Sequence, residues 1–331
     1  MAQIRMFSSK PYDRAAFERA NESFGFDLSF VTDRLTEETA GLGAGADAVC
    51  VFVNDDISAS VLDTLAAGGT ACVALRCAGF NNVDLGAAAG HGLQVVRVPA
   101  YSPNAVAEHT LALILALNRN IHRAYGRVRD GNFSLDGLVG FDLAGKTAAV
   151  IGTGRIGSIV ARLLWHLRCN VLAVDIVRDE HLIELGVEYT DLGTALGNSD
   201  LVTLNCPLTP ETHHLVNAAS IERMRAGVML VNTGRGGLID TSAAITGLKS
   251  GQIGSLALDV YEEESELFFE DRSTQGIDDD VFARLLTFPN VLITAHQAFL
   301  THEALATIAT TTLQNIDAVL GGRSCENLVT T

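Results

Sequence analysis

The sequence is poor in cysteine, with six thiols scattered along 331 residues. They form no CxxC pair and no His/Cys cluster with the spacing of metal ligands, so neither a disulfide framework nor a metal site is expected. This usage is typical of reduced thiols that pack in a protein interior. The N-terminal residues also lack the apolar core of a secretory leader. We therefore expect a cytoplasmic protein that binds no metal ion.

Basic residues are scarce as well. Lys and Arg number 23 against 39 Asp and Glu, which gives a formal net charge of −16. Such a surface repels phosphate backbones and anionic lipids, so nucleic acid and membrane partners are disfavoured. The most apolar helical stretch, residues 111–117, is far shorter than the ~20 residues that span a bilayer. A local basic pocket can still bind a small anion, and we expect a small-molecule substrate.

The chain does contain a repeated βα pattern, in two blocks. Hydrophobic residues make up 48% of the sequence, and the length is about twice that of a typical domain. Apolar runs separated by helical stretches indicate parallel sheets covered on both faces. The fold class expected is therefore α/β, with two doubly wound, Rossmann-like or flavodoxin-like domains and a cleft between them.

The first block contains two helical stretches, 12–21 and 58–67, and Ser58 is expected to cap the second. Ser102 and Pro103 open a long helical segment between the blocks. The second block contains helices at 156–167 and 242–249, and a last helix, 303–320, is closed by Gly321 and Gly322. The strands expected are 4–7, 27–31, 48–53, 72–75 and 93–98, then 147–151, 171–175, 201–204, 228–232, 256–259 and 291–294.

The segment GTGRIG at 152–157 follows an apolar strand and opens a helix. In this GxGxxG arrangement Gly152 permits a tight turn, Gly154 lets the backbone approach a pyrophosphate, and Gly157 lets the helix pack against its strand. The next strand ends in Asp175, where an acid accepts hydrogen bonds from the ribose hydroxyls and repels a 2′-phosphate. Since Ile176 and Val177 follow it rather than Arg, the pattern favours NAD over NADP.

Three further segments follow expected strands at the edge where ligands bind in open α/β sheets. They supply Arg235, the acidic run 262–264 and His296. Arg can bind a carboxylate through its planar guanidinium, and His can deliver a proton to a carbonyl while a nearby carboxylate stabilises the charged imidazole. Three alternatives remain open: Arg235 is a partner in a surface ion pair, residues 262–264 form a solvated acidic face, and His296 is structural.

Seven segments that span nearly the whole chain resemble the D-isomer-specific 2-hydroxyacid dehydrogenases, most of all the fermentative D-lactate branch. The segments are RCAGFNNVD at 76–84, VPAYSP at 98–103, GTGRIG at 152–157, NCPLTPET at 205–212, TGRGG at 233–237, DVYEEE at 259–264 and HQAF at 296–299. The resemblance implies reversible reduction of pyruvate by NADH, with D-lactate as the product.

The resemblance also implies roles for individual residues. Arg235 binds the substrate carboxylate, His296 is the acid/base, Glu264 pairs with His296, and Asp259 lies near the nicotinamide. The implied substrate-binding residues are Ala78, Gly79, Tyr101, Arg235, His296 and Phe299. The implied cofactor-binding residues are Gly152, Gly154, Arg155, Ile156, Gly157, Asp175, Cys206, Pro207, Thr212, Thr233, Gly234 and Asp259.

The resemblance also implies two domains: a discontinuous substrate domain, residues 1–101 with 298–331, and an NAD-binding Rossmann domain, residues 102–297. It further implies that the protein forms a dimer or tetramer. Tyr101 and Phe299 suit the methyl group of pyruvate, and residues 267–271 also resemble the D-lactate branch. Gly234 departs from the family pattern, in which Ser is common. Two alternatives remain: a relative acting on hydroxypyruvate, glyoxylate or a bulkier keto acid, and an NAD-sensing protein of the corepressor type.

Overall fold

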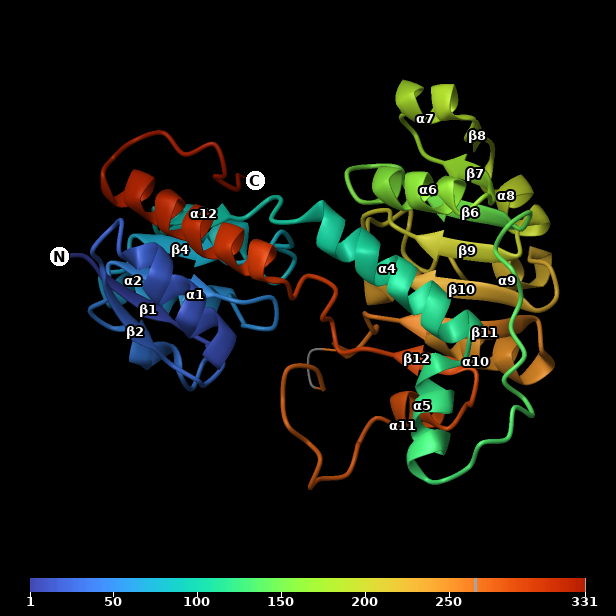
Figure 1. The fold of residues 1–331 in the computed structure, drawn as a ribbon. Coiled ribbons are helices and arrows are strands. Elements are labelled where there is room, and N and C mark those ends of the chain that lie inside the picture. Colours follow the sequence, from blue (N-terminus) through green and yellow to red (C-terminus); the bar gives the residue numbers. More distant parts are fainter. Residues whose placement is uncertain (265–266, 331) are drawn as a thin grey trace. The chain divides into compact units, whose positions relative to one another are not determined.

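A computed structural model describes residues 1–264 and 267–330. The chain divides into two compact units, Met1–Ser102 with Leu300–Thr331, and Pro103–Phe299. Each unit is built around one parallel sheet with helices on its faces (Figure 1). The α/β class and the two doubly wound sheets expected from the sequence are thereby confirmed. No helix among the described residues combines the length and apolarity needed to cross a bilayer.

The first unit has a five-stranded parallel sheet in the order β2-β1-β3-β4-β5, which is the flavodoxin-like order. The last helix of the chain returns to this unit, where α12 packs against α1, β4 and β5. The strands are β1 (Gln3–Met6), β2 (Asp27–Phe30), β3 (Ala48–Val51), β4 (Cys72–Leu75) and β5 (Gln94–Arg97). The helices are α1 (Pro11–Asn21), η1 (Ala40–Gly43), α2 (Ala59–Ala67), α3 (Leu85–Gly90) and α12 (His302–Leu320).

The second unit has a seven-stranded parallel sheet in the order β12-β11-β10-β9-β6-β7-β8. The order reverses between β6 and β9, so this edge is the ligand-binding switch point of a Rossmann-type sheet. Its strands are β6 (Thr147–Ile151), β7 (Asn170–Val174), β8 (Glu188–Tyr189), β9 (Leu201–Leu204), β10 (Val228–Asn232), β11 (Ile253–Leu258) and β12 (Val291–Ile293). Its helices are α4 (Pro103–Asn118), α5 (Ile121–Arg129), α6 (Gly157–His166), α7 (Glu180–Leu185), α8 (Leu192–Asn198), α9 (Ala218–Arg223), η2 (Gly236–Leu238), α10 (Thr241–Ser250) and α11 (Asp280–Leu286).

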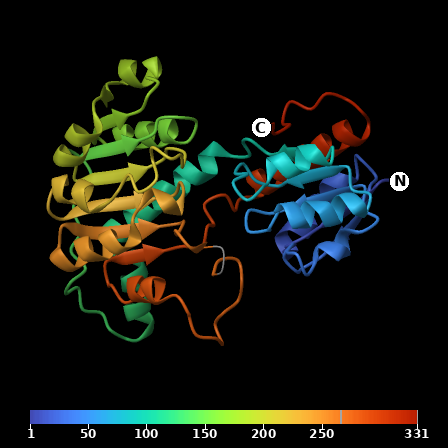
Figure 2. The same cartoon turned by 180° about the vertical axis from the view of Figure 1, so that it is seen from behind.

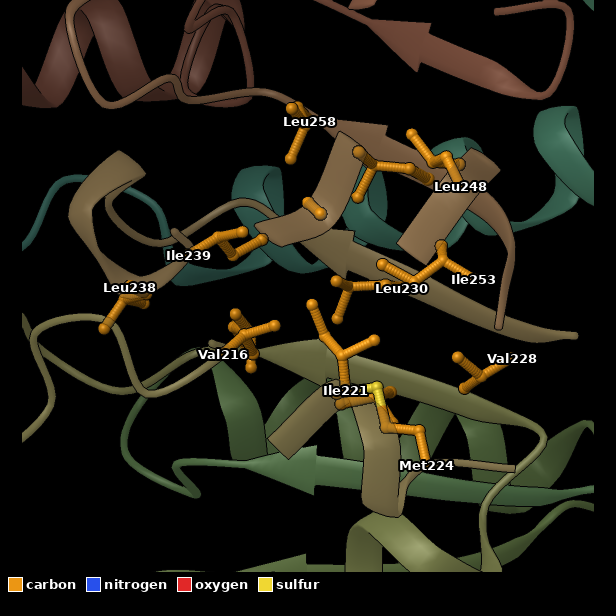
Figure 3. Packing of buried hydrophobic residues seen from close by; sticks show 14 of the residues in the cluster. Val216, Ile221, Met224, Val228, Leu230, Leu238, Ile239, Leu248, Ile253 and Leu258 are labelled. Atoms are coloured by element: carbon orange, nitrogen blue, oxygen red, sulfur yellow. The ribbon is translucent and has the colours of Figure 1, made fainter. Parts of the chain in front are cut away.

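Successive residues of the central strands face opposite sides of this sheet, and both sides are apolar. In β6, Ala148 and Val150 join the core under α4 and α6, whereas Ala149 and Ile151 join the core under α8, α9 and α10. Figure 2, the view from behind, shows the side of the sheet that α8, α9 and α10 cover. Figure 3 shows the packing of that core around Leu230. Burial on both sides explains why these strands read as continuous apolar runs.

Two elements of the second unit have weak sequence signals. The two-residue strand β8 and the helix α5 were not among the elements expected. β8 is too short for a periodic pattern, and α5 has no buried residue. Ser58 does precede α2, but its side chain makes no capping hydrogen bond, so the expected cap is wrong in detail. Its hydroxyl instead donates to Asp56 Oδ2 at 3.1 Å.

Candidate active site

The glycine-rich turn lies between β6 and α6, next to the point where the strand order reverses. Gly152 has φ +90°, and a Cβ there would lie 2.5 Å from Cys206 N. A Cβ on Gly157 would overlap the carbonyl of Gly152, so both positions require glycine. By contrast, nothing lies within 4 Å of a Cβ built on Gly154. This open backbone, followed by the first N–H groups of α6, fits a pyrophosphate.

Asp175 follows β7 and lies beside the glycine-rich turn. Its Oδ2 accepts a hydrogen bond from Thr153 N at 2.5 Å, and its Oδ1 accepts one from Val177 N at 3.0 Å. Burial by itself raises the pKa of this carboxyl, but the hydrogen bonds from Val177 and Thr153 outweigh it and hold the pKa below its usual range. The side chain is thus a fixed carboxylate, as an acceptor for ribose hydroxyls requires.

Arg235 follows β10 on a turn that a buried amide holds together. Asn232 is fully buried, its Nδ2 donates to Arg235 O at 2.8 Å, and its Oδ1 accepts from Gly234 N at 3.0 Å. The half-buried Arg235 donates from Nη1 to Gly234 O at 2.8 Å and forms no ion pair with the described acids. Its guanidinium therefore remains able to bind a carboxylate.

The glycines on either side of Arg235 explain how close the neighbouring strands approach. A Cβ on Gly236 would overlap the backbone of Tyr261, so the Arg235 turn packs directly on the segment that follows β11. A Cβ on Gly234 would lie 3.2 Å from Leu238 Cδ1 and 3.3 Å from Leu204 O. The Ser that is common at position 234 in the family would therefore require a small shift of Leu238.

His296 and Glu264 form a direct pair. His296 Nδ1 lies 2.7 Å from Glu264 Oε1, and both side chains are 16% exposed. The other oxygen of Glu264 accepts from Tyr261 N at 3.0 Å, which fixes the carboxylate. If Nδ1 carries the proton that it donates to Glu264, Nε2 is left for another partner. The rings of Phe269 and Phe299 lie 5.8 and 6.4 Å from the imidazole.

The turn that carries His296 is wrapped around the buried carboxylate of Asp259. Oδ1 accepts from Gln297 N at 2.9 Å and Thr294 Oγ1 at 2.5 Å, and Oδ2 accepts from Ala298 N at 3.0 Å. His296 N donates to the Asp259 carbonyl at 2.7 Å. His296 itself has φ +51°, a conformation that costs free energy and persists only where surrounding bonds impose it.

Burial raises the pKa of the Asp259 carboxyl, but hydrogen bonds from His109 and Thr294 and the N–H of Ala298 outweigh this and lower it. His109, on α4, was missed from the sequence. Its Nε2 lies 3.2 Å from Thr294 Oγ1 and 3.5 Å from Asp259 Oδ1. Since the Thr294 proton goes to Asp259, His109 Nε2 acts as a donor. A polar residue within the apolar helix 103–118 was the available signal.

The remaining expected residues divide between the two units. Cys206, Pro207 and Thr212 lie in the loop after β9, which Thr212 closes by donating from Oγ1 to Pro207 O at 2.7 Å. Thr233 hydrogen-bonds through Oγ1 to Thr110 at 2.8 Å. The residues Ala78, Gly79 and Tyr101 belong to the first unit, and Phe299, expected in the substrate domain, groups with the second. Arg155 and Ile156 lie between Gly154 and α6.

Comparison with known proteins gives one family model and many full-length relatives. The model described as the NAD-binding domain of D-isomer-specific 2-hydroxyacid dehydrogenases matches residues 111–298. A D-lactate dehydrogenase of Escherichia coli is 55% identical, with 98% of this chain and 99% of that protein covered. The solved pyruvate reductase of Chlamydomonas reinhardtii is 47% identical with a TM-score of 0.94, over 99% and 98% of the chains. The D-lactate dehydrogenase of Aquifex aeolicus, solved with NAD and lactic acid, is 33% identical with a TM-score of 0.86, over 99% of each chain.

Proposed function

Because this chain belongs to the D-isomer-specific 2-hydroxyacid dehydrogenase family, whose model describes an NAD-binding domain, we propose that it is an NAD-dependent D-lactate dehydrogenase. The reaction is the reversible conversion of pyruvate, NADH and a proton to D-lactate and NAD. The observation that carries the proposal is the His296–Glu264 pair at 2.7 Å. It lies on the same sheet edge as the glycine-rich turn and Arg235.

The second unit holds the cofactor. Gly152, Gly154, Arg155, Ile156 and Gly157 surround the pyrophosphate, and Asp175 accepts from the ribose hydroxyls. The nicotinamide, when bound, supplies the hydride. Cys206, Pro207, Thr212, Thr233, Gly234 and Asp259 line the nicotinamide side.

Three side chains act on the substrate. Arg235 binds the carboxylate of pyruvate through its planar guanidinium. His296 donates a proton from Nε2 to the carbonyl oxygen as the hydride reaches the carbonyl carbon, and it takes that proton back in the reverse direction. Glu264, on Nδ1, keeps the imidazole in one orientation, with Nε2 left for the substrate.

Each unit has its own proposed substrate contacts. In the first unit these are the backbone N–H groups at Ala78 and Gly79, for the carboxylate, and the ring of Tyr101, for the methyl group; in the second unit Phe299 is the proposed contact of the methyl group. Phe299 lies beside the His296 ring, which supports this role. We further propose that the protein acts in the cytoplasm as a homo-oligomer on small molecules, without nucleic acid or membrane partners, consistent with its net charge of −16.

The test is NADH oxidation measured with a panel of 2-keto acids, followed by chiral analysis of the product from pyruvate. We expect pyruvate to give a larger kcat/KM than hydroxypyruvate, glyoxylate or branched keto acids, and the product to be D-lactate. A higher kcat/KM with another keto acid would reassign the substrate within the family. Turnover far below that of a metabolic enzyme with every keto acid would favour an NAD-sensing protein instead.

A further inference from the structure

Three side chains with metal-binding chemistry lie together outside the residues assigned to cofactor and substrate. His213, His214 and Glu262 each offer one ligand atom, and these atoms all lie within 4.8 Å of one another. The histidines belong to the loop after β9, and Glu262 follows β11. The fold therefore brings two adjacent imidazoles next to one carboxylate, although His214 and Glu262 are 48 residues apart in the sequence.

The carboxylate of Glu262 is oriented before any ion binds. Its Oε1 lies 2.5 Å from His214 Nε2, and its Oε2 accepts a hydrogen bond from Thr241 Oγ1 at 3.0 Å. The Glu262 and His214 side chains are 25% and 34% exposed, so both can be reached from solvent. A second hydrogen bond that fixes a ligand in this way is the usual outer support of a metal site.

The two histidines differ in how firmly they are held. His214 has φ +50°, its N donates to Gly237 O at 2.8 Å, and its carbonyl accepts from Asn217 Nδ2 at 2.9 Å. His213 is exposed, and its ring stacks on that of His214 with centroids 3.9 Å apart and planes at 26°. A ring nitrogen of His213 already lies within 4.8 Å of the other two ligand atoms.

We propose that His213, His214 and Glu262 bind one divalent transition-metal ion of the Zn²⁺ class. Imidazole ligands suit Zn²⁺, Co²⁺ or Ni²⁺, whereas Mg²⁺ requires oxygen ligands in octahedral geometry. Since Zn²⁺ bonds to nitrogen and oxygen are ~2.0–2.2 Å long, the ligand atoms of a tetrahedral site lie ~3.3–3.6 Å apart. His214 Nε2 and Glu262 Oε1, now 2.5 Å apart, therefore separate slightly to admit the ion. A water molecule takes the fourth position of the tetrahedron.

Such an ion joins loops that also carry the proposed reacting groups. Glu262 follows Tyr261, whose N–H donates to Glu264 and whose backbone packs on Gly236, next to Arg235. A bound ion ties the loop after β9 to this segment and stabilises the folded chain. The inference goes beyond the proposed function and does not depend on it, because binding is measured without substrate.

The sequence predicted the opposite, that no metal ion is bound. The reason is physical: adjacent histidines do not by themselves make a recognisable ligand spacing. The third ligand comes from a different strand end, and only the order β9-β10-β11 in the sheet brings it near.

The test is equilibrium dialysis of metal-stripped protein against Zn²⁺, with Mg²⁺ in excess to occupy oxygen sites. We expect one Zn²⁺ per chain and a higher Tm with the ion bound, since a ligand of the native state stabilises it. His213→Ala and Glu262→Gln should each abolish this stoichiometric binding. Thr241→Val, which keeps all three ligands, should weaken binding by about 10–100-fold, as expected for loss of an outer hydrogen bond.

His181→Ala is the matched control, because His181 also lies beside an acid, with Nδ1 at 3.7 Å from Glu184 Oε2. Among residues 1–264 and 267–330, no third ligand joins this pair. We expect His181→Ala to bind Zn²⁺ as the unmodified protein does. The proposal is overturned if the unmodified protein binds no Zn²⁺, if His213→Ala and Glu262→Gln retain full binding, or if His181→Ala loses as much as they do. Equal affinity for Mg²⁺ would overturn the assigned class of ion.

Discussion

Two turns at the same edge of the sheet, after β10 and after β12, hold the proposed reacting groups around a buried side chain, but with different chemistry. The turn with Arg235 closes around the amide of Asn232, which both donates and accepts. The turn with His296 closes around the carboxylate of Asp259, which only accepts. An amide holds its turn at any pH, whereas a carboxylate does so only while ionised. The geometry of the acid/base His296 is therefore coupled to a buried charge, whereas the geometry of the carboxylate binder Arg235 is not.

The largest effect is expected from the acid/base itself. His296→Asn should lower kcat for pyruvate reduction by ~10²–10⁴-fold, because general acid catalysis contributes about that much. NADH affinity, measured by fluorescence titration, should change little, since it depends on the glycine-rich turn and Asp175. Activity close to that of the unmodified protein would remove His296 from the reaction.

The Arg235 turn is tested next. Arg235→Gln should raise the KM for pyruvate by about 10–100-fold, which corresponds to loss of a charge-assisted pair worth ~1.5–3 kcal/mol. The KM of Arg235→Lys should lie between those of the unmodified protein and Arg235→Gln, because Lys keeps the charge but loses the planar two-donor geometry. Steady-state kinetics with saturating NADH measures both. An unchanged KM in Arg235→Gln would show that the guanidinium does not contact substrate.

Exchanging the two central side chains, Asn232 and Asp259, tests the difference between the turns directly. Asp259→Asn places an N–H₂ group against backbone donors, and Asn232→Asp replaces a donor to Arg235 O with a buried charge. Each should reduce the free energy of unfolding by ~1–3 kcal/mol, the cost of a buried polar group left unpaired. Denaturant unfolding measures this, with the exposed Asp142→Asn as control at less than about 0.5 kcal/mol. Unaltered stability in both exchanges would mean that neither group holds its turn.

The pH dependence of stability separates the two turns further. Since the pKa of Asp259 is lowered in the folded state, its contribution is fully present above the unfolded value of ~3.9 and is lost as pH falls through the lower folded value. The stability difference between the unmodified protein and Asp259→Asn should therefore shrink below about pH 4. The corresponding difference for Asn232→Ala should stay constant. If the stability differences of Asp259→Asn and Asn232→Ala changed in the same way with pH, the two turns would not differ in their dependence on a buried charge.

Much of the fold could be predicted because both faces of the central strands are apolar and glycine marks the tight turn at 152. The helix α5 could not, since no residue on it is buried. Within the site, Arg235 and His296 could be singled out because each lies in a segment that follows an expected strand. Glu264 could be distinguished from Glu262 and Glu263 only through the resemblance to the family. His109, Asn232 and Thr294 could not, because their hydrogen bonds join different elements and leave no periodic pattern.

The Glu264–His296 pair is the centre of the proposed mechanism, and the most direct test is the kcat of pyruvate reduction in Glu264→Gln, measured beside its affinity for NADH. The substitution removes the carboxylate that lies 2.7 Å from His296 Nδ1 and fixes the imidazole. We expect kcat to fall by at least about 10-fold, within the ~10²–10⁴-fold that general acid catalysis contributes, while the affinity for NADH changes little. A kcat equal to that of the unmodified protein would contradict the pairing and, with it, the assignment of His296 as the proton donor.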